Sequence, residues 1–350
     1  MTRAELLARR ASGQYLTRPA DKLTVVRDLC GVQAQFFTNA VHALKIRCSN
    51  FEKPSFQNGL VKNWTIRGTM HVFAESDLPI FLHCNDGRDY RRNDWVEQTF
   101  WSSRSSWVLT PERQAYFSDL ICQAVANAPR LREELKEICR AAGMTEAEES
   151  CMFDQWGGGI RLLCERGFLN YSASEEKRFC PSPPFVPIPR READLELARR
   201  YFTHFGPASL HDAMYFFRVT AAQVRQWLAD LPVSVTECDG RTYYWIDHVA
   251  DCPDFPGVCF LAGFDQFLLG YEKKESLCFA QEHLRGIFNL AGIVMPSVLC
   301  HGRIIGRWKQ HGKRIGVETF TEISVQEERL IKNAAETLWP EMTALKFSRL

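Results

Sequence analysis

The sequence predicts an α+β protein made of three tandem winged-helix units followed by a β-rich region and a final helix. Two observations support this prediction. Helix-patterned segments precede β-patterned segments three times along the chain, and the residues after position 251 are mostly strand-like. The predicted boundaries are 1–105, 106–182 and 190–250 for the three winged helices and 251–350 for the C-terminal region. A chain of 350 residues is long enough for several such units.

The bulk composition excludes several classes of protein. The formal net charge is +1, so any binding to a polyanion must come from local basic patches. The 13 cysteines include no C-x-x-C pair and match no zinc site or disulfide framework, so we expect reduced thiols and no metal or cofactor. No stretch reaches the roughly 18 apolar residues of a membrane span, and the charged N-terminus lacks a signal-peptide core. We expect a soluble, cytoplasmic monomer.

The predicted first unit combines short helices with β-structure. Its helix-patterned segments lie at 3–15, 21–30 and 38–47. Asp21 stands where a helix N-cap is expected, and Gly31 where a C-cap is expected. Residues 61–73 are rich in β-branched and aromatic side chains, and Gly68 within them suits a strand with a bulge.

The predicted second unit has the same order of elements. Residues 131–142 and 151–166 have helical patterns, each followed by a glycine. Residues 168–180 then suit a hairpin with a polar turn. The segment 181–189 contains five prolines and therefore predicts a linker, because proline fits neither a helix interior nor a central strand.

The predicted third unit has the strongest local signals. Ser209 and Thr220 each precede a short helix-patterned segment, and two short helices joined by a tight turn match a helix-turn-helix. Asp239-Gly240 between two β-patterned runs is the strongest short hairpin signal, and this hairpin would be the wing.

The C-terminal region carries a basic hairpin. Strands are predicted at 258–269, 293–300, 303–309 and 317–320, and a helix at 325–339. The basic residues of the predicted hairpin are Arg303, Arg307, Lys309, His311, Lys313 and Arg314. They suit contacts with phosphates. The alternative is a solvated β edge protected by charges.

Two glutamines follow the second predicted helix. If the backbone is extended, Gln33 and Gln35 project to the same side and can hold one small object between them, whereas on a helix they would point about 200° apart. The alternative is that these amides satisfy loose backbone groups at a helix end. Likewise, Trp64, Arg67, Thr69 and His71 either belong to a functional site or form the face of an ordinary strand. No H-E-x-x-H, G-x-S-x-G, Walker or G-x-G-x-x-G motif competes.

Four stretches of the chain together resemble one protein family. They are Gly31-Val-Gln-Ala-Gln35, Trp64-Thr-Ile-Arg-Gly-Thr-Met-His71, Phe264-Asp-Gln-Phe-Leu-Leu-Gly270 and Pro296-Ser-Val-Leu-Cys-His-Gly-Arg-Ile-Ile-Gly-Arg-Trp308. The family is the tandem winged-helix DNA glycosylases of the AlkZ type, which carry a Gln-hydrophobic-Gln motif. The likeness extends over residues 3–340. A related branch has Asp at the second position of the motif, where this sequence has Gln35.

The resemblance implies a fold, an activity and a set of site residues. It implies three winged helices around a C-shaped channel for double-stranded DNA, and excision of N7-alkylated purines, including those in interstrand crosslinks. It implies catalytic roles for Gln33 and Gln35. Arg67, Thr69 and His71 are expected to contact the DNA backbone or to shape the site.

The chemistry of the glutamines fits this activity. An N7-alkylated purine is already cationic, so it can leave without an enzyme acid. The enzyme then has only to place a water beneath C1′, and an amide carbonyl can do this although it is no strong base. We therefore expect a monofunctional glycosylase for which neutral bases such as uracil are poor substrates. No lysine is an obvious Schiff-base nucleophile, although Lys45 and Lys62 remain open. The alternative function is a non-catalytic winged-helix DNA-binding protein or regulator.

Overall fold

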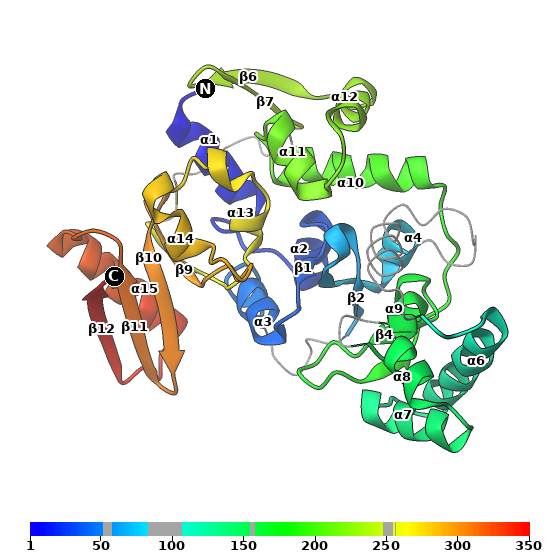
Figure 1. The fold of residues 1–350 in the computed structure, drawn as a ribbon. Coiled ribbons are helices and arrows are strands. Elements are labelled where there is room, and N and C mark those ends of the chain that lie inside the picture. The colour runs from blue at the N-terminus through cyan, green and yellow to red at the C-terminus, as the bar shows by residue number, and fades with distance from the viewer. Residues whose placement is uncertain (52–57, 83–106, 155–157, 248–254, 256) are drawn as a thin grey trace. The chain divides into compact units, whose positions relative to one another are not determined.

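The computed structural model describes residues 1–51, 58–82, 107–154, 158–247, 255 and 257–350 (Figure 1). The chain folds into two compact units, the first built from three segments and the second from two. The first unit comprises Met1–Gln33, Thr38–Lys53 and Leu197–Leu350, and the second comprises Ala34–Phe37 and Pro54–Glu196. Both contain helices and sheets, so the predicted α+β class is confirmed. The chain passes from the first unit to the second within the Gln-Ala-Gln motif.

The three helices predicted around the motif are present, with ends within two residues of the predicted ones. They are α1 (Arg3–Gly13), α2 (Lys22–Asp28) and α3 (Phe37–Lys45), with strand β1 (Val32–Gln33) between the last two. The Asp21 side chain caps α2 by accepting hydrogen bonds from two backbone N–H groups. Gly31 adopts a φ of 80°, and its N–H donates to the Val26 carbonyl oxygen over 2.7 Å. Helix α2 nevertheless ends at Asp28 with Leu29 as its C-cap, so Gly31, predicted as the C-cap, lies two residues beyond the actual cap.

The two short helices and the hairpin predicted for residues 209–246 are present. These elements are α11 (Leu210–Phe217), α12 (Ala221–Asp230), β6 (Ser234–Cys238) and β7 (Arg241–Trp245), preceded by α10 (Arg190–His204). Ser209 and Thr220 each accept a backbone hydrogen bond at a helix start. Asp239 and Gly240 both have positive φ angles, 50° and 73°, as a tight two-residue hairpin turn requires.

A five-stranded sheet forms the C-terminal part of the first unit. Its strands lie in the order β12 (Ala344–Arg349), β11 (Arg314–Thr319), β10 (Arg303–His311), β9 (Ser297–Cys300) and β8 (Val258–Leu261). Helix α15 (Val325–Leu338) lies against this sheet (Figure 1). Its buried residues Ile331 and Ala335 share a core with Phe260, Val298 and Val317.

Two predicted strands in this region need correction, and one strand was missed. The predicted strand 258–269 ends at Leu261, because Asp265 accepts the N–H of Phe267 and starts the short helix α13 (Gln266–Leu269). The predicted strand 293–300 is limited to β9. Strand β12 was not predicted, and it pairs in parallel with β11. The short helix α14 (Leu284–Ile287) lies in the chain between α13 and β9.

Gly306 has no room for a side chain. A Cβ atom there would lie 2.3 Å from the carbonyl oxygen of Glu318 on the neighbouring strand. We expect Gly306→Ala to lower the free energy of unfolding by about 1–3 kcal/mol, because the β10–β11 pair would have to separate. Urea unfolding measures this. Gly257→Ala is the matched control, since nothing lies within 4 Å of its added Cβ. Equal unfolding midpoints for the two variants would contradict the expectation.

The second unit packs helices on a small antiparallel sheet. Its adjacent strands are β3 (Met70–Ala74), β2 (Leu60–Trp64), β4 (Leu169–Tyr171) and β5 (Phe179–Pro181). Its helices are α4 (Leu78–Phe81), α6 (Pro111–Asn127), α7 (Arg132–Ala141), α8 (Glu146–Met152) and α9 (Gly158–Glu165). Residues 182–189 form neither helix nor strand, as predicted for this proline-rich stretch, whereas Pro181 ends β5.

Two predictions for this unit were wrong in part. Residues 61–73 form two paired strands rather than one bulged strand, and Gly68 with a φ of 62° lies in the turn between them. The predicted helix 151–166 is two helices. Gly158 has a φ of 58° and packs against the backbone of Cys151, where a Cβ atom would lie 2.5 Å from the carbonyl oxygen. The predicted hairpin after Phe168 is confirmed as β4 and β5.

Candidate active site

The two glutamines differ in environment. Gln33 ends β1 and is 6% exposed, whereas Gln35 lies in a bend beyond the strand and is exposed. The prediction that Gln33 and Gln35 project to the same side assumed an extended strand through both residues, but the strand ends at Gln33. Among the residues that the structure describes, neither side-chain amide has a hydrogen-bond partner. The structure therefore shows no contact in which these amides satisfy backbone groups at the helix end. Both amides are available to a ligand.

The backbone just before Gln33 is held by a buried glutamine. The side-chain Nε2 of Gln266, in α13, donates to the carbonyl oxygen of Gly31 over 2.5 Å. Gln266 is 1% exposed. The stretch 264–270, which contributed to the family resemblance, therefore supports the chain two residues before Gln33.

A fully buried ion pair holds α13 in place. The Arg47 guanidinium donates to both carboxylate oxygens of Asp265, over 2.6 and 3.0 Å, and both side chains are 0% exposed. Arg47 also donates to the backbone carbonyls of Gln14 and Ala43. Every charge is thus hydrogen-bonded, as a buried pair requires. Sequence reasoning missed Arg47, because no local pattern relates it to a partner 218 positions away.

The structure brings the motif and the 64–71 stretch together. Ala34, between the two glutamines, donates its N–H to the carbonyl oxygen of Met70 over 2.8 Å. Thr69 and His71 flank Met70. The His71 ring is 0% exposed, and its Nδ1 lies 2.8 Å from the Thr65 hydroxyl and 3.1 Å from the Thr69 carbonyl oxygen. These contacts suit a histidine that shapes the hairpin.

The turn that carries Arg67 is braced from α9. Arg67 lies in the 3-10 turn η1 (Ile66–Gly68). From α9, Arg161 donates to the Gly68 carbonyl oxygen over 3.2 Å, stacks 3.7 Å above the Trp64 ring and pairs with Glu165 over 2.8 Å. Sequence reasoning missed Arg161, since a position 93 residues beyond Gly68 carries no local signal of this contact.

The predicted basic residues do lie on one hairpin, β10–β11, but most have acidic partners. The ion pairs are Arg303–Glu327 (3.7 Å), Arg307–Glu318 and Lys309–Glu318 (2.6 Å each), and Lys313–Glu341 (2.9 Å). Hydrogen bonds from Lys309 and Arg307 hold the pKa of Glu318 below its usual range. Arg314 is exposed. Exposed ion pairs are weak, so phosphates can compete for these cations.

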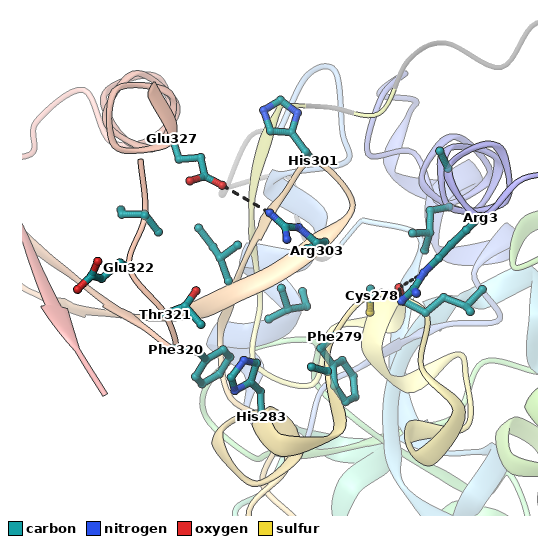
Figure 2. Close-up of a pocket in the computed structure, with 17 residues that line it drawn as sticks. Arg3, Cys278, Phe279, His283, His301, Arg303, Phe320, Thr321, Glu322 and Glu327 are labelled. Atoms are coloured by element: carbon teal, nitrogen blue, oxygen red, sulfur yellow. Dashed lines mark hydrogen bonds and ion pairs between the residues drawn. The ribbon is translucent and has the colours of Figure 1, made fainter. Parts of the chain in front are cut away.

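A cavity of about 740 Å³ lies elsewhere in the first unit. Figure 2 shows Arg303 directed toward Glu327 at its wall, with the rings of His283 and Phe320 stacked 4.6 Å apart. Arg303 is the one predicted site residue that lines it, and neither Gln33 nor Gln35 does. The cavity is therefore separate from the residues of the motif.

Comparisons with known proteins establish the class of this one. The family model described as DNA glycosylase AlkZ-like matches residues 26–339, so the chain belongs to the AlkZ-like DNA glycosylase family, whose enzymes hydrolyse N-glycosyl bonds. An interstrand DNA cross-link repair glycosylase from Streptomyces sahachiroi is 26% identical over 360 aligned positions, covering 95% of this chain and 93% of the relative. The solved Streptomyces sahachiroi DNA glycosylase AlkZ has the same fold, with a TM-score of 0.79 and 21% identity over 100% of both chains.

These findings confirm the resemblance that the four sequence stretches indicated. The matched region includes both glutamines, the 64–71 hairpin and the β10–β11 hairpin. Within the described ranges, no helix is long and apolar enough to cross a membrane. The cysteines described by the structure are all free thiols.

Proposed function

We propose that this protein is a monofunctional DNA glycosylase that hydrolyses the N-glycosyl bond of N7-alkylated, cationic purines in double-stranded DNA. The observation that carries the proposal is the buried Gln33 amide, which has no hydrogen-bond partner among the described residues, two positions from the exposed Gln35. The named activity of the Streptomyces sahachiroi relative supports interstrand crosslinks as one substrate class.

In this proposal the two glutamines position the attacking water. Their carbonyl oxygens accept hydrogen bonds from a water beneath C1′, and their dipoles favour the positive charge that develops on the sugar. The bond from C1′ to the purine breaks, and its electron pair neutralises the base. The water oxygen bonds to C1′ and releases a proton to solvent. Because Gln33 is buried, the local dielectric is lower than in bulk water, and its amide dipole interacts more strongly with the charge on the sugar.

The remaining predicted site residues complete the proposal. Arg67 and Thr69 contact the DNA backbone or shape the site, and His71 acts through the hydrogen bonds that fix the hairpin. The proposed phosphate contacts come from Arg303, Arg307, Lys309, Lys313 and Arg314. Three winged helices around a C-shaped DNA channel would bring both sets to one duplex. No metal or cofactor takes part in this scheme.

The direct test is base release from defined duplexes. Purified protein should release free N7-methylguanine and leave an intact abasic strand, while duplexes with uracil or hypoxanthine remain unchanged. Strand cleavage at the abasic site, blocked by reducing agents that trap imines, would show a lyase rather than a monofunctional enzyme. Binding to alkylated DNA without release of any base would instead establish the non-catalytic DNA-binding protein.

The basic hairpin predicts a measurable salt dependence. We expect the triple change Arg303→Ala, Lys313→Ala and Arg314→Ala to weaken duplex binding and to reduce the slope of log affinity against log salt by roughly 0.9 per lost phosphate contact. Fluorescence anisotropy across a salt series measures the slope. Lys332→Ala, on the exposed face of α15, is the control. If the triple variant and the control have the same slope of log affinity against log salt, this hairpin does not bind phosphates.

A further inference from the structure

A tight turn between α14 and β9, in the first unit, presents an apolar side chain to solvent. Its tip carries Leu290, Ala291 and Gly292, all of them exposed. The exposed fraction of Leu290 is 85%. A single exposed leucine is ordinary on a protein surface. This one differs because its turn is held rigidly and is tied to the backbone that supports the Gln-Ala-Gln motif.

Hydrogen bonds fix the shape of this turn. The Asn289 N–H donates to the carbonyl oxygen of Ile293 over 3.0 Å, and the Asn289 side-chain oxygen accepts the Ile293 N–H over 2.8 Å. The Gly292 N–H donates to the Asn289 carbonyl oxygen over 3.2 Å, and Gly292 has a φ of 77°. Asparagine at the start and glycine at the end are the residues that such a turn favours. The turn has no such need for an apolar side chain at Leu290.

The base of the turn is anchored beside the residues that support the motif. Phe288 and Val294 face each other as an antiparallel bridge, and both are buried in the core of the first unit. The Val294 carbonyl oxygen accepts the N–H of Phe264 over 3.2 Å. Two residues after Phe264, Gln266 donates to the Gly31 carbonyl oxygen. The turn is therefore tied to the same stretch that holds the backbone before the first glutamine of the motif.

One DNA duplex can reach both the motif and the tip of the turn. Leu290 is four residues from Val294, so it lies within about 15 Å of that anchored position, and one turn of a duplex spans about 34 Å. Two cations lie near the turn. Arg285 of α14 is exposed, and the Lys273 Nζ atom lies 5.8 Å from the centre of the Phe288 ring. Neither forms an ion pair with a described residue, so both suit contacts with phosphates.

We propose that Leu290 is a wedge that enters the base stack of the duplex beside the alkylated purine and loosens it. This inference rests on the function proposed above. Apolar side chains inserted between base steps partly unstack them, and contacts between cations and phosphates offset the cost. A base inside an intact stack shields its own glycosyl bond, so chemistry on it requires local opening of the duplex. The wedge would expose C1′ to the water held by the two glutamines.

Unstacking can be measured without turnover. The probe is a duplex in which 2-aminopurine, whose fluorescence rises when it unstacks, lies next to N7-methylguanine on a 2′-fluoro sugar that resists cleavage. At saturating protein, we expect the fluorescence rise to be roughly 3- to 10-fold smaller with Leu290→Ala than with the wild type. Leu290→Met keeps the apolar volume and should retain most of the rise. Val325→Ala, at a site that is 86% exposed, is the matched control and should match the wild type.

Base release provides a second readout. We expect Leu290→Ala to lower kcat/KM for N7-methylguanine in a fully paired duplex by roughly 3- to 30-fold. The loss should shrink when the methylated base lies opposite a mismatch, because that site is already loosened. An equal loss on paired and mismatched duplexes, or a fluorescence rise with Leu290→Ala that equals that of the wild type, would overturn the wedge. Absence of any base release by the wild type would overturn the proposed function instead.

Discussion

Replacing both glutamines, as Gln33→Ala with Gln35→Ala, is expected to lower release of N7-methylguanine by about 100-fold or more. The two amides are the groups proposed to position water and to favour charge on the sugar. Neither has a hydrogen-bond partner among the described residues, so their loss should leave the fold intact. Single-turnover base release measures the rate, and circular dichroism with urea unfolding checks the structure.

The single variants should differ, because the two residues differ in burial. Gln33 is 6% exposed, so its dipole acts in a less polar environment than that of the exposed Gln35. We expect Gln33→Ala to cost more activity than Gln35→Ala. Gln326→Ala, at an exposed position of α15, is the matched control. Unchanged release by the double variant would show that the catalytic assignment is wrong.

Removal of the Asp265 charge is the change with the largest expected effect on stability. Asp265→Asn leaves the Arg47 guanidinium buried without its counter-charge, which typically costs about 3–5 kcal/mol of unfolding free energy. The same carboxylate caps α13, whose Gln266 holds the Gly31 carbonyl oxygen. The variant should therefore also lower glycosylase activity by disturbing the backbone before Gln33. Urea unfolding and base release measure the two effects.

Two further variants isolate the cause. Glu341→Gln breaks the exposed pair with Lys313 and should cost less than about 1 kcal/mol. The double change Arg47→Met with Asp265→Leu removes both buried charges, so it should be less destabilising than Asp265→Asn alone. If Asp265→Asn and Glu341→Gln unfold at the same urea concentration, the buried pair contributes little.

Sequence reasoning succeeded where local chemistry decides the structure. Capping residues such as Asp21 and Ser209 and the turn residues Asp239-Gly240 act on their immediate neighbours, and the elements they predict are present. It failed where pairing or distant partners decide. The hairpin within 61–73 and the unpredicted strand β12 both depend on strands that become neighbours only in the fold.

The same distinction applies to the candidate site. The sequence by itself determined the family, through motifs that include Gln33 and Gln35, and it restricted the proposed substrates to cationic bases, because an amide is not a strong base. Only the tertiary structure decided that Gln33 is buried while Gln35 is exposed. It alone revealed Arg47 and Arg161 as supports. Burial and long-range ion pairs are properties of the folded chain, since they depend on atoms that are distant in sequence and adjacent in space.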